Sequence, residues 1–291
     1  MAIKKKKVAV FGDTILDIFS YYTSPRLSPE APVPVIIENR RDYFAGGAGL
    51  LSKKMLEMDI SIDLYTEIGQ DINGKVLKKK LQNINIFDYS KKSYQTTLKE
   101  RIIVDNKYYL RKDVEKFQRP IKKNILSDFY NNISSYEAVI FSDYAKGFLD
   151  SQLFYSLKNM AIKKGIPTFV DPSIKNIFDF NGVTYFKPNL IESIHISSKK
   201  NISEILHTLA KSYNTTPVIT LGSEGSVSLL DTGIIYSKSY KNKVIDTSGS
   251  GDIFFAYFID SVLSGNTLQY SLDIASKRAS ENVKFFGFLK K

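Results

Sequence analysis

The chain has 291 residues, of which 43% are hydrophobic and 13% aromatic, so it is long enough to bury a sizeable core. It contains no cysteine, which excludes disulfides and thiolate metal sites, and its two histidines are too few for a zinc constellation. No apolar run approaches the roughly 18 residues of a membrane span, and none near the start suits a signal peptide. We therefore expect a globular, cytoplasmic protein without a membrane partner.

The 41 lysines and arginines exceed the 30 acidic residues, and the resulting net charge of +11 raises the question of a nucleic-acid partner. The lysines, however, occur as pairs and triplets scattered over expected helices, without a recognition motif. We therefore expect no nucleic-acid partner. Part of the excess charge would instead attract a nucleotide and phosphorylated substrates.

Two carboxylates follow a short buried strand expected over residues 8–11. Asp13 and Asp17 stand four apart just past Gly12, where this strand ends. Open α/β sheets bind ligands at the carboxyl ends of their strands, so this pair could hold the hydroxyls of a sugar. A turn with solvent-facing acids is the alternative, and a lone Gly-Asp pair favours it.

Prolines keep residues 24–34 extended, and this segment leads into an expected strand over roughly 33–44. Gly46 and Gly47 then stand at the entrance of a helix. Glycine at such a position allows the backbone to approach a sugar closely, and a plain turn is the alternative.

A hairpin is predicted over roughly 95–114, about the turn at Asp105 and Asn106. With residues 33–44 it would form a small sheet outside the core. Arg101 and Arg111 lie on this hairpin, and arginine forks suit a distal phosphate on a substrate. Exposed charges that discourage aggregation of a strand edge are an equally good explanation.

Polar residues follow two further strands. Lys146, after an expected strand over 139–142, could hold a phosphate, and a surface lysine is the alternative. Asn189 and Glu192 stand three apart after Pro188, which places an amide and a carboxylate at the start of a helix. The same spacing is typical of a capping box, and the two interpretations are compatible.

Residues 243–259 form the stretch around which the chain is organised: a β-branched run, a turn of Asp, Thr, Ser and Gly, and a long apolar helix. Gly249, Ser250 and Gly251 would present unpartnered backbone amides to an anion at the positive end of the helix dipole. Asp252 would repel a phosphate held there, so we expect it to accept a proton from a substrate hydroxyl. Simple helix capping is the alternative.

Strands and helices alternate from end to end, without an internal repeat or a flexible linker. This order predicts one α/β domain over residues 1–291, with a parallel-rich central sheet. The strands at roughly 33–44 and 95–114 are not needed for that sheet, and we expect them to form a lid.

Several segments resemble one known family. The segment from Asp246 to Asp252, Asp-Thr-Ser-Gly-Ser-Gly-Asp, resembles the signature of the ribokinase-like (PfkB) carbohydrate kinases, with Ser250 in place of the usual alanine. Residues 26–35, Arg-Leu-Ser-Pro-Glu-Ala-Pro-Val-Pro-Val, and 142–147, Ser-Asp-Tyr-Ala-Lys-Gly, are similar to segments of its heptose-7-phosphate kinase branch, the kinase half of ADP-heptose synthases. The resemblance covers nearly the whole chain.

This resemblance implies a ribokinase-like three-layer sandwich and ATP-dependent phosphorylation of a hydroxyl of a sugar or sugar phosphate. In the family, the residue matching Asp252 is the base, and the amides of 249–251 stabilise the transferring phosphoryl group. The residues matching Asn189 and Glu192 order Mg²⁺ through water and the nucleotide phosphates.

The remaining assignments from the resemblance concern the acceptor and the nucleotide strand. Asp13 and Asp17 match positions that hold the acceptor sugar. Thr220 and Gly222 lie in a segment similar to the strand that approaches the nucleotide. The lid of such kinases covers the sugar and often forms the surface of a homodimer.

One position departs from the family pattern. Leu50 stands where an asparagine, following Gly46 and Gly47, hydrogen-bonds the acceptor, and an apolar side chain cannot replace an amide. A nucleoside or other small-alcohol kinase on the same fold, and a catalytically weak sugar- or nucleotide-binding protein, therefore stay as alternatives. The nucleotidyltransferase half of bifunctional heptose enzymes is expected to be absent.

Overall fold

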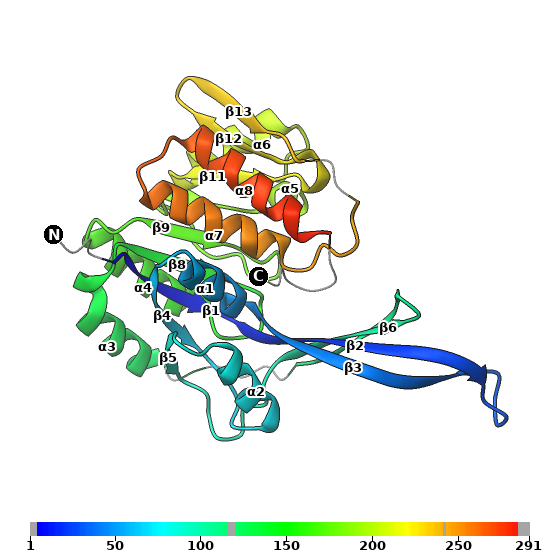
Figure 1. The fold of residues 1–291 in the computed structure, drawn as a ribbon. Helices are drawn as coiled ribbons and strands as arrows, with labels where there is room; N and C mark the ends of the chain where they lie inside the picture. Colours follow the sequence, from blue (N-terminus) through cyan, green and yellow to red (C-terminus); the bar gives the residue numbers. More distant parts are fainter. Residues whose placement is uncertain (1–4, 116–119, 121, 241–242, 285–291) are drawn as a thin grey trace.

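The computed structural model describes residues 5–115, 120, 122–240 and 243–284, and the domain expected over 1–291 extends beyond these ranges. The described residues form two sheets (Figure 1). The larger has nine strands in the order β13-β12-β11-β10-β9-β8-β1-β4-β5, and the smaller has four in the order β3-β2-β6-β7. The smaller sheet is called the lid below.

Short parallel strands make up most of the large sheet. They are β1 (Lys7–Gly12), β4 (Ser61–Thr66), β5 (Asn85–Asp88), β8 (Ala138–Ser142), β9 (Thr168–Asp171), β10 (Tyr185–Phe186) and β11 (Thr216–Thr220). Antiparallel strands β12 (Ser226–Leu230) and β13 (Gly233–Ser237) complete one edge. Strand β1 is apolar on both faces because it is buried from both sides: Val8 and Val10 enter one core, and Ala9 and Phe11 enter the other.

Helices cover both faces of the large sheet and bury these two cores. One core includes residues of α1 (Ala48–Glu57), α2 (Ile72–Lys80), α7 (Ser250–Leu263) and α8 (Leu268–Asn282). The other includes residues of α3 (Lys122–Asn132), α4 (Ser151–Lys163), α5 (Leu190–Ser197) and α6 (Ile202–Tyr213). The expected three-layer sandwich with a parallel-rich sheet is therefore confirmed. Within the described ranges, no helix is both long enough and apolar enough to cross a bilayer.

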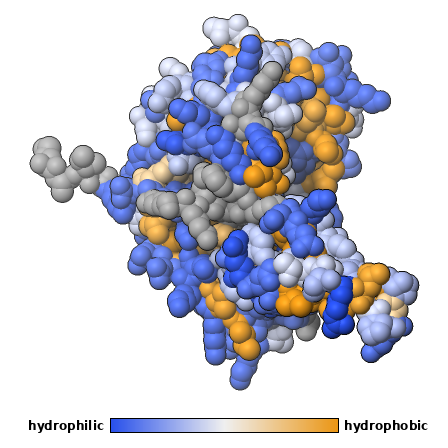
Figure 2. Space-filling model, turned by 45° about the vertical axis from the view of Figure 1, so that its right-hand side comes forward, coloured by the Kyte–Doolittle hydropathy of each residue, from blue (hydrophilic) through white to orange (hydrophobic). Residues whose placement is uncertain are grey.

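The lid consists of β2 (Thr14–Leu27), β3 (Pro34–Gly47), β6 (Leu98–Val104) and β7 (Lys107–Val114). It projects from the body as a long arm (Figure 1), and its surface carries apolar side chains among polar ones (Figure 2). The turn between β6 and β7 has φ angles of 48° at Asp105 and 63° at Asn106, as suits the residues expected there.

Strand β2 is the main departure from the sequence analysis, which ended a strand at Gly12 and expected no strand directly after it. Asp13 alone separates β1 from β2, so the chain passes from the large sheet into the lid without a loop. The run Ile-Leu-Asp-Ile-Phe over residues 15–19 is rich in β-branched and aromatic side chains, which favour a strand. The Gly-Asp pair concealed this signal.

Candidate active site

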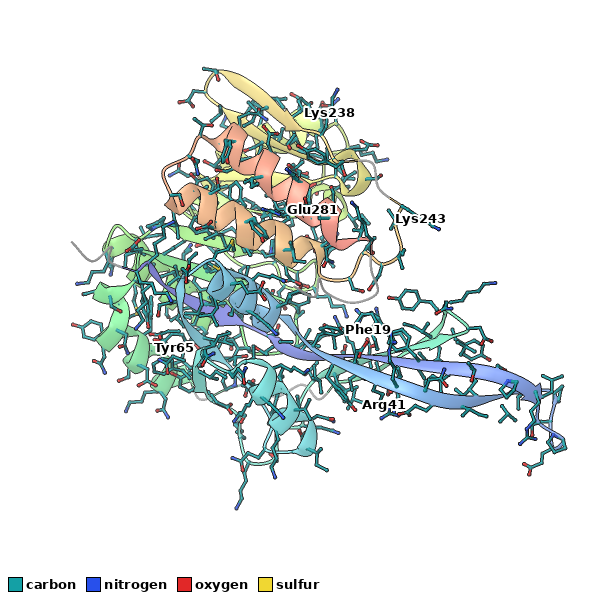
Figure 3. All side chains as sticks on the ribbon, in the orientation of Figure 1. Phe19, Arg41, Tyr65, Lys238, Lys243 and Glu281 are labelled. Carbon is teal, nitrogen blue, oxygen red and sulfur yellow. The ribbon has the colours of Figure 1, made fainter. Side chains whose placement is uncertain are left out.

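The candidate site lies at the carboxyl ends of the parallel strands, where β1, β8, β9 and β10 end side by side. The residues that follow these strands include Asp13, Tyr144 and Lys187, and Asp171 is the last residue of β9. Helix α7 begins next to this edge. In Figure 3, Phe19 lies at the base of the lid, and the segment that bears Lys243 faces the tip of the β6–β7 hairpin.

Asp252 lies in the first turn of α7 and is only 4% exposed. The hydroxyl of Tyr144 donates a hydrogen bond of 2.6 Å to its Oδ1 atom. Burial raises the pKa of Asp252 to about 7, against the opposing effect of that hydrogen bond. Nearby Asp171 raises this pKa further, whereas Lys187 lowers it. A carboxyl group with such a pKa can exchange a proton at neutral pH.

The glycine-rich loop leads directly into α7. Gly249 caps the helix with φ 70°, a left-handed conformation that glycine adopts without strain. The amide of Ser250 donates to the carbonyl of Thr247 over 3.3 Å, and its hydroxyl donates to the same carbonyl over 2.8 Å. A Cβ atom on Gly251 would meet nothing within 4 Å, so the space beside this turn is open. The Ser250 amide is not unpartnered, contrary to the sequence analysis, because the turn closes onto Thr247. The positive end of the helix dipole still suits an anion here.

Asp13 holds the loop after β8. Its Oδ2 atom accepts hydrogen bonds from the amides of Tyr144 and Lys146, both of 3.0 Å, and Oδ1 accepts one of 3.1 Å from Phe148. The side chain is buried, and burial raises the pKa of Asp13 while the three amides oppose that rise. Asp13 thereby positions the residues that approach Asp252.

Asp17 lies in β2 and pairs with Arg101 of β6. Burial raises the pKa of Asp17, and the guanidinium opposes this. Gly46 of β3 pairs with Ile15, and a Cβ atom there would stand 1.9 Å from Oδ2 of Asp17, so a larger residue would displace this carboxylate. The φ angle of Gly47 is 58°, in the left-handed region that favours glycine. A Cβ atom at Gly47 would also lie 2.5 Å from the carbonyl oxygen of Asp13. Both glycines thus allow close backbone packing around the two acids.

Four basic side chains gather where the lid faces the loop after β8. Lys146 pairs with Glu115 at 2.5 Å, and the exposed Arg111 pairs with Asp113 at 2.9 Å. The sequence analysis did not select Lys99, whose charge interacts with those of Lys146, Arg101 and Arg111. Alternation along β6 places Lys99 and Arg101 on one face, which is a signal that could have found it.

Lys99 differs from the other three because no ion pair among the described residues includes it. Its ammonium group lies over the ring of Tyr144, 5.3 Å from the centroid. Burial lowers the pKa of Lys99, and Asp17 opposes this. A partly buried ammonium group without a carboxylate partner suits an anionic ligand.

A pocket of about 330 Å³ separates the lid hairpin from the loop that precedes α7. Arg101, Tyr108 and Arg111 line it from the lid, and Asp246 and Ser248 line it from the loop. The hydroxyl of Tyr108 is hydrogen-bonded to Asp246, so the lid touches the glycine-rich loop directly.

The other half of the site surrounds the start of α5. Asn189 and Glu192 form the expected capping box: the Asn189 side chain accepts from the Glu192 amide at 2.9 Å, and the Glu192 side chain accepts from the Asn189 amide at 2.8 Å. A β-bridge joins Asn189 to Thr220. Gly222 follows with φ 60°, and a Cβ atom there would meet nothing. These four residues are therefore close together beside open space.

A buried ion pair between Lys187 and Asp171 lies between the start of α5 and the start of α7. The sequence analysis did not identify it. Nζ of Lys187 lies 3.0 Å from Oδ1 of Asp171, and Lys187 is only 3% exposed. Burial raises the pKa of Asp171, and Lys187 opposes this. Lys187 lies two residues before Asn189, in a segment that the sequence analysis had associated with a ligand, and Asp171 ends the neighbouring strand β9.

Comparison with known proteins identifies the family. The sequence matches the pfkB family carbohydrate kinases over residues 5–288. The chain belongs to this family. It is therefore a carbohydrate kinase, and kinases of the family use ATP, typically with Mg²⁺.

Two curated relatives of this kinase are bifunctional HldE proteins. The kinase is 30% identical over 287 residues to the HldE protein of Helicobacter pylori (strain Shi470). The aligned region covers 94% of this chain and 62% of the relative. It is 28% identical over 293 residues to the HldE protein of Coxiella burnetii (strain Dugway 5J108-111). That alignment covers 98% of this chain and 61% of the relative. The kinase thus spans less than two thirds of these relatives, and its expected likeness to the heptose branch is confirmed.

Solved structures share the fold of this kinase. Phosphofructokinase-2 from Escherichia coli, in complex with substrates and products, is 15% identical with a TM-score of 0.78, covering 96% of this chain and 93% of that one. Arabidopsis thaliana ribokinase, complexed with ribose and ATP, is 17% identical with a TM-score of 0.73. The superposition covers 98% of this chain and 95% of the ribokinase chain. At such identities the likeness concerns the fold alone.

The residues present in this kinase fit a magnesium ion held through water. Asn189 and Glu192 supply the hard oxygen atoms that Mg²⁺ prefers, and burial raises the pKa of Glu192. Within the described ranges, no cluster of three or more acidic or histidine side chains could hold a metal alone. Two such oxygen donors suit an ion that keeps several of its water ligands.

Removal of the Asp13 carboxylate should destabilise the kinase strongly. Asp13→Ala leaves three amides of the loop after β8 without their acceptor, so we expect the free energy of unfolding to fall by about 2–4 kcal/mol. Urea denaturation measures this change. The matched control is Asp231→Ala, an exposed acid that should shift stability by less than about 0.5 kcal/mol. An equally small effect at Asp13 would contradict the anchoring role.

Proposed function

We propose that this kinase transfers the terminal phosphoryl group of ATP to a hydroxyl of a sugar phosphate, with Asp252 as the general base. The acceptor oxygen forms the bond to phosphorus as the bond to the bridging oxygen of ADP breaks. Asp252 takes the proton that the hydroxyl loses. The products are ADP and a sugar that carries one more phosphate.

The observation that carries this proposal is the buried carboxylate of Asp252 at the start of α7. Burial raises the pKa of Asp252 to about 7, which suits a group that takes up a proton near neutral pH. The open space beside Gly251 lies in the same helical turn, where backbone amides can stabilise a transferring phosphoryl group. The proposed base, Asp252, and the backbone amides that would bind the phosphoryl group thus lie within one helical turn of each other.

The nucleotide would lie between the glycine-rich loop and the start of α5. Thr220 and Gly222 border this space, and Asn189 and Glu192 would hold magnesium through water. When bound, the ion would neutralise charge on the phosphates. Lys187, paired with Asp171, adds a fixed positive charge between this half of the site and Asp252.

The acceptor would lie under the lid, where the positive charge gathers. Lys99, Arg101, Arg111 and Lys146 favour an acceptor that already carries a phosphate. Asp17 of β2 would contact sugar hydroxyls. The likeness to the heptose branch makes a heptose 7-phosphate the first acceptor to test.

Two other functions remain distinguishable by experiment. Leu50 is buried at the start of α1, where it offers no hydrogen bond to a sugar. A nucleoside or other small-alcohol kinase would phosphorylate those acceptors in preference to sugar phosphates. A catalytically weak binding protein would bind sugar or nucleotide in calorimetry without releasing ADP.

Loss of the base should abolish turnover without loss of nucleotide binding. We expect Asp252→Asn to lower kcat by about 10²–10⁴-fold while the Kd for ATP changes little. A coupled assay of ADP release and calorimetry with magnesium-ATP measure the two quantities. The control is Asp260→Asn on the same helix, whose carboxylate pairs with Lys6 and is remote from the glycine-rich loop. Near-normal turnover of Asp252→Asn would remove Asp252 as the base.

Loss of the Lys99 ammonium group, which has no carboxylate partner among the described residues, should selectively weaken the binding of phosphorylated acceptors. We expect Lys99→Met to raise KM for sugar phosphates by about 10- to 100-fold, because a hydrogen bond between charged groups is lost. KM for unphosphorylated sugars should stay nearly unchanged. Lys112→Met is the control, since Lys112 is exposed on β7 of the same lid sheet. An equal effect on both classes of acceptor would contradict a role in binding the phosphate.

We propose further that two copies pair through their lids. Leu27 and Ile37 are 65% and 52% exposed, and β3 and β7 leave the lid with two strand edges. Ile37→Asp should convert the dimer to a monomer in analytical ultracentrifugation, whereas Ile177→Asp, equally exposed outside the lid, should not. A wild-type protein that is monomeric at every concentration would contradict this pairing.

A further inference from the structure

The contact between Tyr144 and Asp252 joins residues that are 108 positions apart in the sequence. The phenol donates to Oδ1 of the carboxylate at 2.6 Å, a length typical of a hydrogen bond to a charged oxygen. No hydrogen bond among the described residues reaches Oδ2 of Asp252. One oxygen of the carboxylate is therefore held by the protein, and the other remains for a ligand.

The position of the Tyr144 ring is determined from three sides. The Tyr144 amide donates to Asp13 at 3.0 Å, which places the start of the side chain. A Cβ atom on Gly47 would lie 3.4 Å from two ring carbons, so the backbone of Gly47 packs against the ring. Lys99 lies over the ring, 5.3 Å from its centroid. Few other orientations of the hydroxyl are compatible with these contacts.

We propose that Tyr144 is a positioning residue for the base: its hydroxyl holds Oδ1 of Asp252 so that Oδ2 meets the acceptor hydroxyl. This inference rests on the proposed function of Asp252. A donor to one oxygen restricts rotation of the carboxylate about its χ2 angle, which orients the second oxygen. The same donor stabilises the charged form of the base.

The charged surroundings of Asp252 explain why such a donor is needed. Burial and two neighbouring carboxylates, Asp171 and Asp17, all raise the pKa of Asp252. Lys187 and the Tyr144 hydroxyl oppose them. Lys187 is already paired with Asp171, so Tyr144 is the neighbour whose hydrogen bond acts directly on the carboxylate.

The test is the pH dependence of kcat/KM for Tyr144→Phe. A base must be deprotonated to act, so the wild-type rate should rise through about pH 7 and then level off. Without the phenol the carboxylate binds a proton more tightly, and the midpoint should move up by about one pH unit. The loss should accordingly be about tenfold at low pH and smaller on the plateau. Tyr130→Phe, at an exposed tyrosine of α3, should leave the midpoint unchanged.

A second measurement follows the carboxyl group without turnover. In protein labelled with ¹³C-carboxyl aspartate, the Asp252 signal is identified by its absence from Asp252→Asn, and its titration should show the same upward shift in Tyr144→Phe. Circular dichroism and ATP binding confirm that the variant is folded. A loss of rate that is equal at all pH values, with an unmoved titration, would overturn the positioning role.

The outcomes separate this inference from the proposed function. If Asp252→Asn is inactive but Tyr144→Phe has the wild-type pH profile, only the role of Tyr144 fails. If Asp252→Asn retains turnover, the assignment of the base fails, whatever Tyr144→Phe shows.

Discussion

The active site of this kinase depends on the buried carboxylate of Asp13 and the three backbone amides that donate to it. A charge can be buried there because the amides solvate it in place of water. These hydrogen bonds hold the loop after β8, and that loop carries Tyr144 to Asp252. The carboxylate of Asp13 thus determines where the Tyr144 side chain lies relative to Asp252.

Opposite charges are arranged in order from one end of the site to the other. The lid contributes basic side chains, the centre contains the carboxylates Asp17, Asp252 and Asp171, and Lys187 lies on the side of α5. Each central carboxylate has one neutralising or hydrogen-bonding neighbour, which limits the cost of burying it. In the proposed function, the ends of the site attract phosphates while its centre accepts a proton.

Local patterns in the sequence predicted features that are themselves local. The alternation of strands and helices indicated the layered fold, and the spacing of Asn189 and Glu192 indicated a capping box that the structure contains. Long-range contacts were not predictable in this way. Nothing near Tyr144 in the sequence indicates that its hydroxyl meets Asp252, and nothing near Asp13 indicates amide donors that lie more than 130 residues away. The alternation along β6 could have placed Lys99 beside Arg101, but its contact with the ring of Tyr144 is long-range and was not predictable.

The β2–β3 hairpin of the lid leaves and rejoins the body at one place. Thr14 pairs with Gly47, and the amide of Ala48 donates to the carbonyl of Asp13 at 3.0 Å. Since its two ends are adjacent, the hairpin is inserted into the body at a single point, and its other strand pairing among the described residues is that of β2 with β6 inside the lid. Variation within the lid therefore leaves the path of the chain through the large sheet unchanged.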